Sequence, residues 1–93
     1  MPREAALFEQ MNGSVVEAYL VIRETGANIP PMWIERARES RKKKEKELGQ
    51  LLMEGKLEAV SYLREWELAY KKEMFYQGIR ILLELQRQGR SKL

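Results

Sequence analysis

A chain of 93 residues, of which 44% are hydrophobic and 33% charged, has room for one domain and is too apolar to stay disordered. It contains no histidine and no cysteine, which removes the commonest general base, the usual thiol nucleophile and the usual transition-metal ligands. We therefore expect a protein that is not an enzyme and that binds neither a cofactor nor a metal. A domain this small is marginally stable alone, so we also expect a homo-oligomer, with a dimer as its simplest form.

The N-terminal segment begins with a predicted short helix. Pro2 to Met11 is expected to form one or two helical turns, because Leu7, Phe8 and Met11 recur at helical spacing. Asn12-Gly13 is a dipeptide that favours turns and ends this segment.

A second helix is expected after this turn. Ser14 precedes Glu17 by three residues, the spacing of a capping box, and the helix should run to about Glu24 and stop at Gly26. A strand is the alternative, but the apolar residues of Val15 to Ile22 do not alternate and have no second strand to pair with. The same segment is too short to cross a bilayer, and the N-terminus lacks a secretion signal. We therefore expect a cytoplasmic protein without membrane contact.

Two prolines mark the clearest boundary in the chain, since Pro30 and Pro31 fix their own backbone and restrict the residue before each of them. Pro31 can itself occupy the first turn of the next helix. From Met32 to about Glu54 the residues are strong helix formers. The middle of this helix is almost entirely charged, so we do not expect it in the core.

Two architectures fit the residues that follow. Gly55 can end the helix in a left-handed conformation and start an antiparallel hairpin, which we prefer. Alternatively, a single helix continues through Gly55 without a turn. This alternative is favoured by a coiled-coil pattern with alternating steps of four and three residues, at Leu48, Leu52, Gly55, Ala59, Tyr62, Trp66 and Ala69. We predict one all-α domain: a helical segment over residues 1–27, a proline linker over 28–31, and a long hairpin or continuous helix over 32–93, completed by oligomerisation.

The segment from Leu57 to Gln88 has two apolar faces. One face carries Ala59, Tyr62, Leu63, Trp66, Ala69, Tyr70 and Met74, and the opposite one carries Phe75, Tyr76, Ile79, Leu82, Leu83 and Leu85. If the first face packs on the preceding helix, the second must meet either Val15 to Ile22 or a second copy of the chain. The aromatic ladder Tyr62, Trp66 and Tyr70 could stack on bases, but we prefer a core or interface role. The candidate interface residues are Tyr62, Trp66, Tyr70, Phe75, Ile79, Leu82 and Leu83.

The net charge of +3 has a local source. A basic run, defined here as Arg36, Arg38, Arg41, Lys42, Lys43, Lys44 and Lys46, could attract an acidic protein or the phosphates of a nucleic acid. The simpler interpretation is a solvated face, because glutamates such as Glu45 lie among these cations at pairing distance along a helix. A zipper-type DNA-binding helix is poorly matched, since Gly55 interrupts its seam and no asparagine lies in the basic run.

The segment from Glu73 to Glu84 resembles the closing helix of small helical proteins of Gram-positive bacteria and of their phages and mobile elements. The similar positions are Glu73, Phe75, Gly78, Arg80 and Leu82. The resemblance covers about a dozen residues and implies a helical hairpin without indicating any chemistry.

Taken together, these patterns predict a non-enzymatic adaptor or inhibitor, a class to which phage inhibitors of host enzymes belong. We expect it to self-associate through Phe75, Ile79, Leu82 and Leu83 and to bind a protein partner through the basic run. The alternative is a dimeric nucleic-acid-binding protein that uses the same run.

Overall fold

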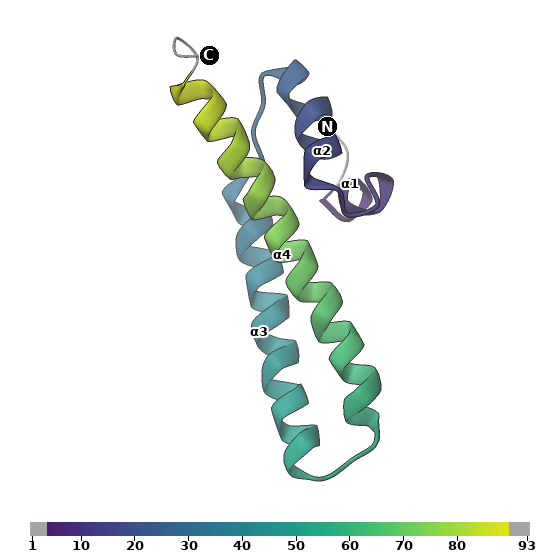
Figure 1. Cartoon of the computed structure of the whole chain (residues 1–93). Helices are drawn as coiled ribbons and strands as arrows, with labels where there is room; N and C mark the ends of the chain where they lie inside the picture. Colours follow the sequence, from purple (N-terminus) through teal and green to yellow (C-terminus); the bar gives the residue numbers. More distant parts are fainter. Residues whose placement is uncertain (1–3, 90–93) are drawn as a thin grey trace.

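The chain folds into a long helical hairpin with two short helices beside one end of it (Figure 1). The structure, a computed structural model, describes residues 4–89. Within that range the helices are α1 (Glu4–Gln10), α2 (Val15–Ile22), α3 (Pro31–Met53) and α4 (Glu58–Gln88), with a turn of 3-10 helix, η1 (Arg23–Thr25), after α2. None of these residues lies in a strand. The predicted all-α fold with a helical hairpin is thus confirmed.

The hairpin turn is made by Gly55 rather than by a break in a continuous coiled coil. Gly55 has a φ of 67°, its N–H donates to the carbonyl of Leu52 at 3.1 Å, and the N–H of Lys56 donates to the carbonyl of Leu51 at 3.2 Å. This pair of hydrogen bonds around a left-handed glycine is a Schellman motif, which satisfies the last carbonyls of α3 and reverses the chain. The continuous-helix alternative is therefore wrong.

The start of α2 is also set by local chemistry. Ser14 Oγ accepts a hydrogen bond from the N–H of Glu17 at 3.3 Å, as predicted, but the N–H of Ser14 donates to the carbonyl of Met11 at 2.9 Å. Glu17 therefore does not close the second half of the capping box.

Two other helix ends also follow the sequence. Gly26 ends η1 with a φ of 72°, and Pro31 is the first residue of α3. Pro2, where the first helix was expected to begin, lies outside the described residues.

The core lies where α1 and α2 cover the C-terminal half of α4. The buried residues of this cluster are Leu7, Ala18, Ile22, Ile29, Ile34, Ala37, Phe75, Tyr76, Ile79 and Leu83. Edge-to-face ring contacts link Phe8 to Phe75 at 5.1 Å and Trp33 to Tyr76 at 5.6 Å between ring centroids, an arrangement that favours aromatic pairs. The core at this end of the molecule is therefore built from residues of all four α-helices.

The other end of the hairpin extends beyond α1 and α2 (Figure 1). In this distal arm, residues 44–67, the buried side chains are those of Leu48 and Ala59, while Met53 and Leu57 near the turn are 89% and 88% exposed. The chain has a radius of gyration of 16.0 Å, against about 12 Å for a compact domain of this length. Two helices cannot enclose a core between them, so the distal arm leaves much of its apolar surface exposed.

Candidate functional site

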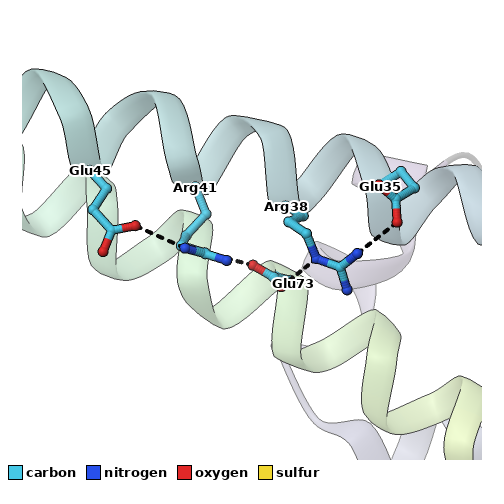
Figure 2. Close-up of polar contacts among 5 residues, drawn as sticks. All are labelled: Glu35, Arg38, Arg41, Glu45 and Glu73. Atoms are coloured by element: carbon cyan, nitrogen blue, oxygen red, sulfur yellow. Dashed lines mark hydrogen bonds and ion pairs between the residues drawn. The ribbon is translucent and has the colours of Figure 1, made fainter.

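A charged cluster connects α3 to α4 halfway along the hairpin (Figure 2). Arg38 and Arg41 lie one turn apart on α3 and both contact Glu73 of α4. Arg41 Nε is 2.8 Å from Glu73 Oε1 and Arg38 Nε is 3.3 Å from Glu73 Oε2. On the outer side, Arg38 pairs with Glu35 at 2.6 Å and Arg41 pairs with Glu45 at 2.8 Å. Each arginine therefore bridges an exposed glutamate to a carboxylate whose side chain is only 5% exposed.

The two arginines keep the buried carboxylate ionised. Burial alone would raise the pKa of Glu73, but the hydrogen bonds and charges of Arg41 and Arg38 outweigh it and hold the pKa below its ordinary value of 4.5. The hydrogen bond to Glu73, followed by the one to Glu45, raises the pKa of Arg41 above its ordinary value. Both oxygens of Glu73 already accept from an arginine, so the cluster is suited to holding α3 and α4 in register.

This cluster contains a buried carboxylate, Glu73, and it corrects one expectation from the sequence. The basic run was expected to form one surface, whereas its members are divided between two sides of α3. Arg38 and Arg41 point toward α4, and Lys44 does the same, with its Nζ 4.0 Å from Glu65 and 5.5 Å from the centre of the Tyr62 ring. The other four members are exposed: Arg36, Lys42, Lys43 and Lys46.

The aromatic ladder is also divided. Tyr62 Oη donates a hydrogen bond to the carboxylate of Glu47 on α3. This bond, followed by burial, raises the pKa of Tyr62 to about 12. The ring of Trp66 is stacked on that of Tyr70, with centroids 5.7 Å apart. Trp66 is half-buried, and its indole N–H has no hydrogen-bond partner among the described residues. Tyr70 is exposed, so the aromatic side chains change along the helix from a contact with α3 at Tyr62 to a solvent-exposed position at Tyr70.

The predicted self-association surface is mostly buried inside the chain. Phe75, Ile79 and Leu83 lie in the core cluster that contains Leu7, Ala18 and Ile22, and Leu82 is exposed at its rim. Of the two packing partners considered for this face, the helix formed by Val15 to Ile22 is the one that the structure provides. Three of the four residues expected to carry self-association are therefore used for packing within the chain.

A third face of α4 remains uncovered. We define the third face as the exposed apolar residues Val60, Leu63, Tyr70, Met74, Ile81 and Leu85. With 100° between successive residues of a helix, the central residues of this face lie roughly a quarter to a third of a turn from the residues that meet α3, such as Ala69 and Glu73. They lie nearly half a turn from Ile79, which meets α2. From sequence, Leu63, Tyr70 and Met74 were grouped on one face with Tyr62 and Trp66, because a helical wheel does not show where the neighbouring helices lie.

The sequence did contain one signal for the third face. Val60, Leu63, Tyr70, Met74 and Ile81 fall on a regular spacing of three and four residues, in which Glu67 and Gln77 occupy the two remaining positions. This repeat lies beside the one on which the continuous-helix alternative depended.

Neither a metal site nor a membrane span emerges from the described residues. Within residues 4–89, no three carboxylate side chains are close enough together to hold a metal ion. No helix in the same range combines the length and the apolar character needed to cross a bilayer. No protein-family model, curated protein or solved structure matches the chain. The functional argument therefore depends on the surfaces described above.

Proposed function

We propose that this chain is a non-enzymatic helical interaction module, of the adaptor or inhibitor class, and that it binds a protein through the third face of α4. The observation that carries the proposal is the extent of this face, which runs from Val60 to Leu85 over about 38 Å of helix. Large exposed apolar patches mark interaction sites, and this row of exposed apolar side chains extends along most of α4.

The neighbouring features support the same role. The charged cluster around Glu73 holds the middle of α4 against α3, and the enclosed core holds the C-terminal half of α4. A rigid helix with an open apolar face is the arrangement used when one helix packs on another. The polar positions on this face, Glu67 and Gln77, are few, as expected for the centre of a protein interface.

A nucleic-acid ligand is the weaker proposal. Arg38, Arg41 and Lys44 of the basic run are engaged with α4, so fewer cations remain for phosphates than the sequence suggested. Binding carried by the remaining lysines would be weak and would fall steeply with salt. Binding of a mixed-sequence duplex at physiological salt that is lost on joint K42E, K43E and K46E substitution would favour this alternative.

Site-specific photo-cross-linking in the organism that encodes the chain tests the main proposal. A photoreactive amino acid is placed at Leu63 on the third face and, as the matched control, at Leu68. Both leucines lie on α4 and both are 47% exposed, but Leu68 lies outside the third face. We expect discrete protein adducts from position 63 and only background from position 68. Equal background from both positions would overturn the proposal.

A further inference from the structure

We propose that the occupant of the third face is a second copy of this chain, with the two α4 helices packed antiparallel across a two-fold axis level with Lys72. This inference rests on the proposed function, because it names the partner that the same surface binds. The four long helices of such a dimer would form a bundle in which each distal arm gains the cover that it lacks in a single chain.

The four central apolar residues of the face, though not Val60 and Leu85 at its ends, are arranged as a two-fold axis requires. In a symmetric dimer the same patch must be complementary to itself. Leu63 and Ile81 lie nine residues before and after Lys72, and Tyr70 and Met74 lie two residues before and after it. In an antiparallel pair, Leu63 therefore meets Ile81 of the partner subunit and Tyr70 meets Met74 of the partner subunit.

The spacing along the face is that of a helix–helix seam. The positions from Val60 to Ile81 follow steps of three and four residues, the heptad repeat that keeps one stripe facing a partner helix. A seam of this kind uses a narrow stripe, and the third face is such a stripe between the sides occupied by α3 and α2.

Glu67 decides the direction of the two helices. A parallel pair would place Glu67 against its own copy in the seam, where two like charges repel each other. In the antiparallel pair Glu67, five residues before Lys72, lies opposite Gln77 of the partner subunit, five residues after it. Glu67 is also neutralised within its own chain by Lys71, at 3.1 Å. The antiparallel arrangement therefore removes the repulsion that the parallel one creates.

The surface area of the chain agrees with a dimer. The accessible surface is 6743 Å², whereas a compact monomer of 11.0 kDa exposes about 5,600 Å². The excess of about 1,100 Å² is comparable to the roughly 800 Å² that each partner buries in a standard stable interface.

Sedimentation equilibrium of the purified full chain is the first test. We expect a mass of twice 11.0 kDa at tens of micromolar, and a dissociation constant raised by roughly a hundredfold or more in L63E. The matched control L68E keeps the dimer, because Leu68 has the same exposed fraction as Leu63 but lies outside the seam. Both residues are exposed, so circular dichroism should show unchanged helicity in both variants. A monomeric wild type, or equal weakening by both substitutions, would overturn the inference.

The direction of the helices can be measured separately. The chain has no cysteine, so a single spin label can be attached through S61C, an exposed position of α4 outside the third face. Each label lies eleven residues of helix from the two-fold axis, so the two labels are separated along the helices by twice that length, and the spacing between the helices adds a lateral offset. Electron–electron distance measurement should therefore give about 40 Å for the antiparallel dimer. A parallel pair would give about 20 Å and would contradict the proposed geometry.

Failure of the inference and failure of the proposed function give different results. A monodisperse monomer that still forms position-63 adducts with a different protein would overturn the second copy as occupant and leave the interaction module standing. A monomer without position-63 adducts would overturn both.

Discussion

At the scale of single residues, Glu73 is the side chain whose charge matters most to the fold. It is buried and ionised, and it has an arginine on each carboxylate oxygen. Since Arg38 and Arg41 are partly exposed and also hold Glu35 and Glu45, removal of Glu73 does not leave them without partners. The loss of stability should therefore be smaller than for a fully buried ion pair.

We expect E73Q to lower the free energy of unfolding by about 1–3 kcal/mol at neutral pH. The pKa of Glu73 in the folded chain is below its ordinary value of 4.5, so the ionised group stabilises the fold above that pH and the contribution is lost as the pH falls through the folded pKa. Urea unfolding from pH 7 to pH 3 should show a wild-type advantage over E73Q that is constant above about pH 5 and shrinks below it.

Glu65 provides the matched control for this experiment. Its side chain is 59% exposed and lies 4.0 Å from Lys44, an exposed pair of the kind that contributes little to stability. E65Q should change the free energy of unfolding by less than about 0.5 kcal/mol. An E73Q effect as small as that of E65Q would show that the cluster does not hold the hairpin together.

At the scale of elements, three of the helix ends were predictable because each has its own local signal. The Ser14 cap, the first-turn Pro31 and the left-handed Gly55 act through their own backbone and nearest neighbours. The faces of α4 were not predictable in the same way. Glu73 and Glu65 look alike in sequence, yet one is buried and the other exposed, because only the three-dimensional positions of α2 and α3 decide which side is covered.

Two alanine substitutions, one at a glycine inside α3 and one at the glycine of the hairpin turn, should change the stability of the chain in opposite directions. Gly49 lies inside α3, and a Cβ there would meet nothing within 4 Å, so G49A should stabilise the chain by about 0.5–1 kcal/mol through helix propensity. A Cβ at Gly55 would also meet open space, but its φ is +67°, so G55A should destabilise by about 1–2 kcal/mol. Chemical denaturation at fixed protein concentration measures both. Stabilisation by G55A would indicate that the chain prefers a continuous helix through the turn.

At the scale of the whole molecule, the chain is an elongated body with principal extents of 55 × 22 × 20 Å. One end has a core of its own, whereas the distal arm has almost none. The predicted self-association was assigned from sequence to the enclosed end, mostly on residues that the structure buries in the core of the chain itself. Phe75, Ile79 and Leu83 are the most apolar stripe of α4, and the chain uses that stripe for its own core, which leaves the less obvious third face exposed.

If the chain dimerises as we propose, its stability should depend on protein concentration. Because such a dimer dissociates when its chains unfold, the midpoint of thermal unfolding should rise by about 3–5 °C for each tenfold increase in concentration. In L63E the midpoint should lie lower and be independent of concentration, whereas L68E should follow the wild type. Differential scanning calorimetry from about ten micromolar to one millimolar separates these cases. A concentration-independent wild-type midpoint would mean that the hairpin is stable without a second copy, since mass action acts on any dimer that dissociates on unfolding.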